Sequence, residues 1–423
     1  MKAFRTIWIL GGLFFAILLS LRLGNFFSPE KKIPQIEEVA QSFEDFMIPT
    51  DVKVIGIGEA THGNREFQIV KKELLQKLAE DGNGRAICFE MSAGEAARLN
   101  DAVHDSGVDL TEEIGKTDYP LYDTKEMVDL LSWMRAYDEK VPYEESLMIY
   151  GVDMQGAIRS VEYLRGACEK LPEYFTDDEV KKLLSMQGDE KEVYTNEKEF
   201  FETLYRRLAG CEKQEGKLLA IQAQVVLQSI DAPDYDKEPE EYSAHRDDSM
   251  ADNLKSYSRI EAARGYSQIM ITAHNGHVMK GASSTGGNDE NLSMGGKIDR
   301  LFEGSYYCIG TEFYRTCVNI HTAGTYEEEY ERANHEYCSE DPLAYQAKFF
   351  KDEMYCLDFD RITDKDSTVY KLLHKNIFTG LVGEGYNPLS DIYRSERCKM
   401  TLADRYDAMI FYYEATPIDP IHY

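Results

Sequence analysis

The chain has 423 residues, enough for one large domain with insertions or for two domains, and 43% of its residues are hydrophobic. It carries 76 acidic and 47 basic side chains, giving a formal net charge of −29. Such an acidic surface repels the phosphates of nucleic acids, and we therefore expect no nucleic-acid partner. The same surface attracts cationic small molecules. The eight cysteines include no CxxC pair, which argues against a zinc site made of thiolates and leaves disulfide pairing open.

The N-terminus has the features of a membrane-targeting segment. Lys2 and Arg5 precede an apolar run over residues 6–21, about the length of a signal-peptide core or a short membrane span. No clean cleavage site follows this run. We therefore expect residues 1–24 to anchor the protein in the cell membrane, with an extracytoplasmic catalytic domain; the alternative is a cleaved signal peptide and a secreted protein.

Residues 25–48 are expected to form a polar linker and a short helix at 36–46, and the domain itself is expected to span 49–423. The domain is organised around residues 52–66, VKVIGIGEATHGNRE. Its apolar beginning predicts a buried strand, which leads directly into a loop rich in ionisable residues. Asn64 is a suitable N-cap for a helix that carries an apolar stripe and ends at the glycine-rich turn 81–84.

Further apolar runs predict strands at 86–89, 147–152, 268–273, 306–310 and 407–413, and apolar spacing predicts helices near 93–99 and 124–137. Alternating strands and helices predict an α/β fold with a central, mostly parallel sheet and flanking helices. Residues 160–257 contain charged helical patterns and no strand-like run. We expect them to form a helical insertion, which either caps the sheet or presents a solvated face.

Ionisable residues follow the ends of four predicted strands. Because the carboxyl ends of parallel strands meet at one edge of a sheet, where ligands bind, we expect these side chains to converge there. Asp153 has a second interpretation, since a carboxylate after a strand often caps the next helix. The residues are Glu59, His62, Glu90, Asp153, His274 and His277.

This set of side chains predicts hydrolysis by an activated water. A neutral His62 can accept a proton from water, while Glu59 or Glu90 fixes its tautomer. His274 and His277 can then hold the substrate carbonyl or the charge that develops on it. The absence of a GxSxG turn disfavours a serine nucleophile.

The same residue types can also bind zinc, manganese or iron, so a metal-dependent hydrolase or peptidase is an alternative. The HExxH arrangement on a helix is absent, and we predict neither a metal nor a cofactor. A third alternative, from another class, is a non-catalytic cell-surface protein linked to exopolysaccharide.

The motifs together resemble the erythromycin esterase family, which includes proteins labelled as succinoglycan-biosynthesis-like. The similarity extends from about residue 52 to residue 417. The motifs are GEATHG at 58–63 with Arg65, Glu66 and Phe67, FE at 89–90, GVD at 151–153, RDxxMxxN at 246–253, AHNGH at 273–277 and the terminal DAMIFYYEAT.

The resemblance implies an α/β core with helical insertions and hydrolysis of a macrolide lactone by water, an activity associated with antibiotic resistance. It implies catalytic roles for His62, Glu59, Glu90 and His274. The resemblance also implies a role for a basic side chain near the first motif, which either Arg65 or Lys71 can provide. We expect substrate contacts from four further residues, His277, Arg65, Asp153 and Arg246. The expected partner is a small ester or lactone; the sequence does not determine the oligomeric state.

Overall fold

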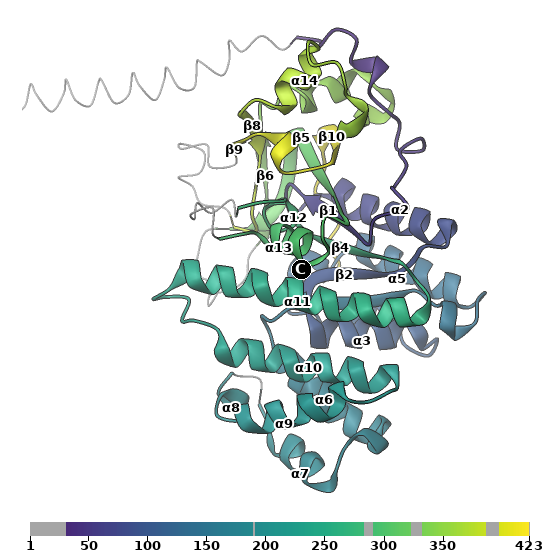
Figure 1. Ribbon diagram of the computed structural model, residues 1–423, viewed down its shortest axis with the longest axis vertical. Helices are drawn as coiled ribbons and strands as arrows, with labels where there is room; N and C mark the ends of the chain where they lie inside the picture. Colours follow the sequence, from purple (N-terminus) through teal and green to yellow (C-terminus); the bar gives the residue numbers. More distant parts are fainter. Residues whose placement is uncertain (1–30, 189–190, 283–290, 323–331, 386–396, 423) are drawn as a thin grey trace, which may run out of the picture.

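The computed structural model describes residues 31–188, 191–282, 291–322, 332–385 and 397–422 (Figure 1). The strands are β1 (Val54–Glu59), β2 (Gly84–Ser92), β3 (Met148–Asp153), β4 (Gln268–His274), β5 (Tyr306–His321), β6 (Arg332–Cys338), β7 (Met354–Asp358), β8 (Ile377–Gly380), β9 (Arg397–Met400) and β10 (Ala408–Ala415). Eight of them form one sheet in the order β3-β2-β4-β1-β5-β10-β7, with β6 paired to β5, while β8 and β9 form a separate hairpin. The strands from β3 to β10 in this order run parallel, and β6 and β7 are antiparallel additions, which confirms the predicted mostly parallel sheet.

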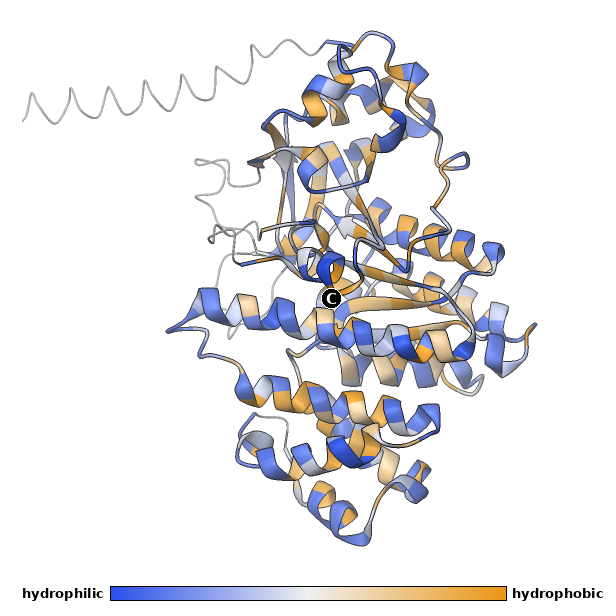
Figure 2. Ribbon diagram, viewed as in Figure 1, coloured by the Kyte–Doolittle hydropathy of each residue, from blue (hydrophilic) through white to orange (hydrophobic). Residues whose placement is uncertain are grey.

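The central strands are buried on both faces because helices cover each side of the sheet. Side chains alternate along a strand, so each strand supplies both layers. In β1, Val54 belongs to one hydrophobic core, whereas Ile55 and Ile57 belong to the other. Figure 2 shows apolar residues in orange on the strands and along the helices beside them.

The helices form two unequal groups. One group, α2 (Arg65–Asp81), α3 (Ala93–His104), α4 (Leu110–Ile114) and α5 (Lys125–Asp138), packs mainly in the core that contains Ile55. The residues between β3 and β4 form α6 (Ile158–Lys170), α7 (Asp177–Ser185), α8 (Glu192–Thr195), α9 (Lys198–Ala209), α10 (Gln214–Asp231) and α11 (Pro239–Arg264). The long helix α11 lies against β3, β2 and β4, and α10 and α9 lie beyond it (Figure 1). The remaining helices are α12 (Asn275–Val278), α13 (Met294–Leu301) and α14 (Thr368–Leu373).

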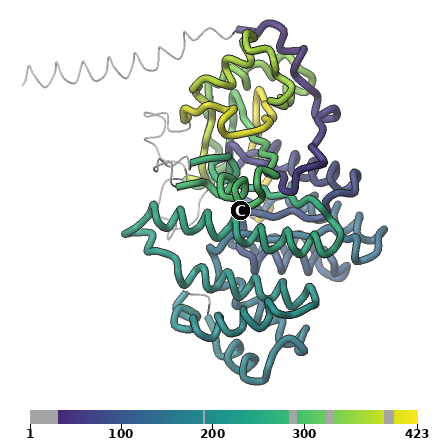
Figure 3. Tube along the Cα trace, viewed as in Figure 1, coloured from purple at the N-terminus to yellow at the C-terminus, as the bar shows by residue number. Residues whose placement is uncertain are grey.

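The helix predicted at residues 36–46 is wrong. The structure has only a 3-10 turn at Ile36–Glu38, after which the chain runs beside the C-terminal part of the molecule (Figure 3). There the backbone of Gln41 forms a two-way bridge with Cys356 of β7, with N···O distances of 3.0 and 2.9 Å. The apolar residues Phe43 and Phe46 are buried, so tertiary pairing with the sheet edge replaces the local helix.

Two local predictions near the strand ends change in detail. Strand β2 continues to Ser92, so Glu90 lies within the strand at a register shift, not after it. Asn64 occupies the N-cap position of α2, but its side chain makes no capping hydrogen bond. It donates instead to the carbonyls of Cys317 and Thr416 at 3.0 and 2.9 Å, and thereby joins the first loop to β5 and the end of β10.

The expected N-terminal anchor, residues 1–24, lies outside the described residues. In the part of the chain that is described, the longest and most apolar helices fall short of what crossing a membrane requires.

Close packing of α3 against α6 gives a test of the fold. A Cβ added at Gly94 would lie 2.1 Å from the carbonyl carbon of Arg159, so Gly94→Ala must separate the two helices. We expect it to lower the free energy of unfolding by about 3 kcal/mol. Gly166→Ala, in α6, meets nothing within 4 Å and should raise that free energy by about 0.5–1 kcal/mol. Urea denaturation of both variants measures the difference; equal stabilities would contradict the packing.

Candidate active site

A cavity of about 910 Å³ lies at the carboxyl ends of the parallel strands. Glu59 at the end of β1 is in register with His274 at the end of β4, as the sequence predicts. Besides residues from the strand ends, the lining includes α11 and two segments that connect regular elements. The lining includes His62, Glu90, His274, His277, Arg246, Asp118, Tyr119, Tyr122 and Glu384.

His62 lies in the tight loop between β1 and α2. A side chain at the next position is impossible, since a Cβ on Gly63 would lie 1.9 Å from the carbonyl oxygen of Asn319. The loop is therefore pressed against β5 and held in place. His62 Nδ1 faces Glu59 Oε2 at 3.7 Å, and its ring centroid is 5.0 Å from that of His274. Its other nitrogen, Nε2, makes no hydrogen bond within the described chain, so it is available to a water or a substrate.

Glu59 is held by two residues of α2 that lie on one face of the helix, three positions apart. Lys71 forms an ion pair with Glu59, and both side chains are 1% exposed. Gln68 donates to Glu59 Oε2 at 3.2 Å and accepts from Lys71 Nζ at 2.8 Å. Burial raises the pKa of Glu59, but the charge of Lys71 and the contact with His62 outweigh burial and leave that pKa below its ordinary value. The carboxylate is thus ionised behind the imidazole.

Surrounding carboxylates favour the charged form of His62. Burial lowers the pKa of this imidazole, but the contact with Glu59 and the charges of Glu90, Glu59 and Glu384 together raise the pKa above its ordinary value. A base with a raised pKa binds a proton from water more strongly, and the resulting imidazolium is stabilised where it forms.

His274 is the opposite case. Gly276 N–H donates to Nδ1 at 3.3 Å, which leaves the ring proton on Nε2, where it is 3.2 Å from the carbonyl oxygen of Val382. Burial, followed by the positive charge of His62, lowers the pKa of His274 to about 3, so this ring is neutral at ordinary pH. Both nitrogens are engaged within the chain. His274 therefore packs against His62 and is not placed to bind a substrate carbonyl as predicted.

Arg246 of α11 links β3 to β2. It donates to both oxygens of Asp153, with Nε distances of 3.1 and 3.0 Å, and to Glu90 Oε1 at 2.7 Å. Burial raises the pKa of Glu90, but His277, Arg246 and His62 outweigh it and lower that pKa strongly. Arg246 is the one arginine or lysine among the described lining residues. It therefore places a fixed positive charge at the cavity wall.

His277 lies on the other side of Arg246. Its Nδ1 is 2.6 Å from Asp247 Oδ1, and its Nε2 is 3.3 Å from Glu90 Oε1 and 3.2 Å from Arg246 Nη1. Burial lowers its pKa, but the charges of Glu90 and Asp247 outweigh burial and raise it. Like His274, this ring uses both nitrogens within the chain.

The structure brings most of the predicted set together and corrects two members. Glu59, His62, Glu90, Arg246, His274 and His277 meet at the cavity or directly behind it. Arg65 does not: it is 56% exposed and lies 3.3 Å from Glu126, because it begins α2 on the side away from the cavity. Asp153 is fully buried beneath Arg246 and cannot touch a substrate; its Oδ1 also accepts from Gln155 N–H at 3.0 Å. This last contact lies in the turn before α6, whose N-cap position is Ala157, so Asp153 does not cap that helix.

Sequence reasoning missed several contributors. The pairing of Gln68 with Lys71 could have been found from their three-residue spacing in the predicted helix. Asp247 was visible only as part of the RDxxMxxN motif. Tyr119 and Glu384 lie in irregular segments, and no pattern in the sequence indicates that they line the cavity.

Among the described residues, no three or more His, Cys, Asp or Glu side chains form a group suited to hold a metal ion. The carboxylates that the sequence offers as ligands have cationic partners here: Arg246 pairs with Glu90 and Asp153, and Lys71 with Glu59.

The comparisons with known proteins agree with this fold. Residues 80–415 match the erythromycin esterase family. The chain belongs to the erythromycin esterase family. The match includes Glu90, Arg246, His274 and His277, and begins after the loop that carries His62.

One curated relative is the erythromycin esterase type II of Escherichia coli, which is 27% identical over 130 residues. The match spans 30% of this chain and 30% of that relative. Among solved structures, a Bacillus cereus protein has a TM-score of 0.68 at 19% identity, covering 92% of this chain and 98% of its own. A succinoglycan biosynthesis protein gives 0.64 at 16% identity (88% and 90% covered), and a mutant of the erythromycin esterase EreC in its open conformation gives 0.58 at 15% (86% and 91%). At these identities the structures share the fold.

The opposite pKa shifts of His62 and His274 are testable by NMR titration of the imidazole resonances. We expect His62 to titrate above pH 6.5, its ordinary value, because Glu59 and its neighbours stabilise the charged ring. In Glu59→Gln the His62 midpoint should move to lower pH, since the largest favourable contribution is removed. His274, with a pKa of about 3, should remain neutral in both proteins at neutral pH. An unchanged His62 midpoint in the variant would contradict the assignment of Glu59 as its partner.

Proposed function

We propose that this member of the erythromycin esterase family hydrolyses a carboxylic ester or macrolactone, with His62 as general base. The observation that carries the proposal is the free Nε2 of His62 at the cavity, with an ionised Glu59 behind the same ring. His274 and His277 use both ring nitrogens within the chain, which leaves His62 as the imidazole able to take a proton.

In the proposed reaction, a water held at His62 Nε2 attacks the acyl carbon of the ester. The water proton moves to Nε2 as the new C–O bond forms, and Glu59 stabilises the imidazolium. Arg246, at the cavity wall, supplies positive charge toward the developing oxyanion. When the tetrahedral intermediate collapses, the C–O bond to the alcohol breaks and His62 returns the proton to the departing oxygen. The products are a carboxylic acid and an alcohol.

The substrate is proposed only by class. The name of the Escherichia coli relative and the family together support an ester of macrolide type, and a cavity of about 910 Å³ is large enough for a drug-sized ligand. Metal-dependent hydrolysis is the competing proposal. The neutralisation of Glu90, Asp153 and Glu59 by Arg246 and Lys71 supports the metal-free route, and the chelator arm of the next experiment separates the two.

A panel of esters and lactones tests the proposal with wild type and His62→Ala side by side. We expect loss of the general base to reduce kcat at least about 100-fold. The exposed His374, which stacks on Tyr370 in α14, provides the matched control His374→Ala, whose activity should equal wild type. In wild type, kcat/KM should rise with pH through the raised pKa of His62, because the neutral ring is the active form. Equal activity of wild type and His62→Ala, or activity lost with chelator and restored by one metal, would contradict the proposal.

We also propose that residues 1–24 anchor the enzyme in the cell membrane with its domain outside the cytoplasm. The support is the pair Lys2 and Arg5 followed by the apolar run at 6–21. Full-length protein should remain in the membrane pellet after alkaline carbonate extraction, whereas a chain starting at residue 25 should be released. Release of the full-length protein by carbonate would contradict the anchor.

A further inference from the structure

The segment 117–122 forms one wall of the candidate active site. Five of its residues, from Asp118 to Tyr122, line the cavity. The segment connects α4 to α5 and has no regular structure except a 3-10 turn at Pro120–Tyr122. Such a segment lacks the backbone ladder that fixes a strand, so its position depends on side-chain contacts. On the cavity side one such contact is from Tyr122 OH to the carbonyl oxygen of Glu90, at 3.3 Å.

Glu95 holds this segment from behind. It lies in the first turn of α3, five residues after Glu90, and is 1% exposed. Its Oε1 accepts from the backbone N–H of Asp118 at 2.7 Å and from Thr117 Oγ1 at 3.3 Å. Thr117 Oγ1 in turn accepts from Tyr119 N–H at 3.2 Å. Two successive backbone amides of the wall are therefore fixed by one buried carboxyl group.

Arg159 of α6 holds the same segment through its side chain. It donates to both oxygens of Asp118, from Nε at 2.6 Å and from Nη2 at 2.8 Å. Such a bidentate pair fixes orientation as well as distance. A further bond, from Nη1 to Glu162 at 2.8 Å, keeps the guanidinium in place. Because Asp118 itself lines the cavity, Arg159 acts on the cavity through one intervening residue.

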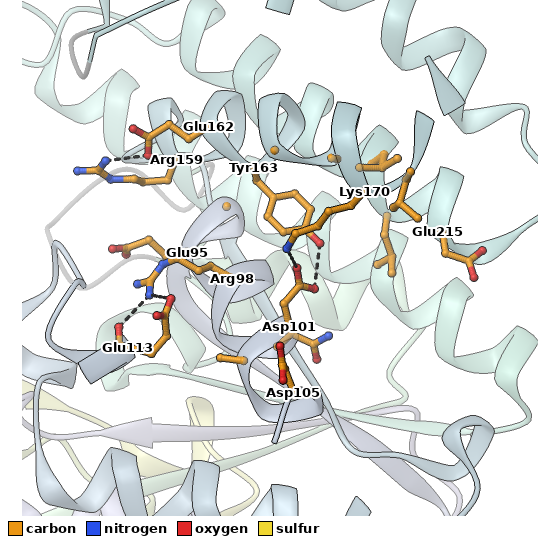
Figure 4. A pocket seen from close by; sticks show the side chains of 18 of the residues that line it. Glu95, Arg98, Asp101, Asp105, Glu113, Arg159, Glu162, Tyr163, Lys170 and Glu215 are labelled. Atoms are coloured by element: carbon orange, nitrogen blue, oxygen red, sulfur yellow. Dashed lines mark hydrogen bonds and ion pairs between the residues drawn. The ribbon is translucent and has the colours of Figure 1, made fainter. Parts of the chain in front are cut away.

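Both residues belong to a second cavity, a groove of about 570 Å³ between α3 and α6 (Figure 4). In Figure 4 Glu95 lies between Arg159 on one side and the pair Arg98 and Glu113 on the other. Arg98 donates to the carbonyl oxygen of Glu113 at 2.8 Å, which ties down α4 immediately before the wall segment. The contacts that Glu95 and Arg159 make with the wall thus come from outside the site where the proposed chemistry occurs.

Burial makes Glu95 suited to this place. It raises the pKa of Glu95 to about 7, against the hydrogen bond from Asp118 N–H, so that a large fraction of the carboxyl groups is uncharged at neutral pH. A neutral carboxyl still accepts a hydrogen bond at one oxygen and does not repel the Asp118 carboxylate. A glutamine has the same shape and an equivalent acceptor.

We propose that Glu95 and Arg159 are positioning residues that fix the wall segment 117–122, and that they thereby set the affinity for substrate without taking part in the chemical step. This inference rests on the proposed ester hydrolysis for its kinetic part only. Neither residue lines the catalytic cavity, so their removal should loosen the wall while His62 and Glu59 keep their geometry.

Two measurements test the proposal on the full chain. Hydrogen exchange followed by mass spectrometry should show faster exchange of the amides at 117–122 in Glu95→Ala and in Arg159→Ala. With an ester found in the panel above, KM should rise roughly 10-fold while kcat stays within about 3-fold of wild type. In Glu95→Gln, the exchange rates at 117–122 and KM should both equal those of wild type, because glutamine keeps the acceptor for Asp118 N–H.

Lys170→Ala is the matched control, since Lys170 lines the same groove but pairs with Asp101, at 3.2 Å, and not with the wall. It should change neither exchange nor KM. Unchanged exchange and KM in both alanine variants would overturn the proposal, as would a fall in kcat with KM unchanged. Arg159→Ala decides the question if Glu95→Ala does not fold, because the Arg159 side chain is 30% exposed. The exchange measurement needs no turnover, so the positioning role stands or falls separately from the ester hydrolysis.

Discussion

The buried ion pair between Glu59 and Lys71 is the interaction on which the candidate site depends. A carboxylate taken out of water normally becomes neutral, because the charged form loses its hydration. Lys71 prevents this at Glu59, and Gln68 bonds to both partners. A neutral Glu59 would neither orient His62 nor stabilise its imidazolium. The unit of strand, loop and helix from β1 to α2 therefore places two opposite charges together: β1 carries the carboxylate of Glu59, and α2 carries its counter-charge, Lys71.

Charge neutralisation also explains why three neighbouring histidines differ. His277 lies beside Glu90 and Asp247, so its charged form is favoured. Burial and the positive charge of His62 disfavour the charged form of His274, so its neutral form is favoured. A second positive ring 5.0 Å from His62 would oppose the protonation that a general base must undergo. Keeping His274 neutral thus preserves the basicity of His62.

The sequence predicts those site residues that regular strands and helices position. Residues at the ends of β1, β2 and β4 converge because parallel strands of a sheet must end at one edge, and a period of two or of 3.6 reveals the strands and α2. The antiparallel additions β6 and β7 and the hairpin of β8 with β9 were not predicted; they extend the sheet edge and the loops beyond the core. Residues 36–46 have helix-like spacing, yet pair with β7, because local periodicity carries no information about a distant sheet edge. The prediction that Arg65 contacts the substrate is wrong for a related reason: closeness in sequence to His62 does not determine which side of α2 a side chain occupies.

The two halves of the cavity are held in position by different kinds of contact. The half that contains His62, Glu90 and Arg246 is built on strand ends and a long helix, whose backbone hydrogen bonds fix these side chains within narrow limits. The wall at 117–122 has only local turn hydrogen bonds, such as the one from Tyr122 N–H to the carbonyl oxygen of Tyr119, and side chains of α3 and α6 hold it from the far side. Tyr119 and Tyr122 line the cavity from this wall, so part of the aromatic surface of the cavity is held by side-chain contacts and not by the sheet.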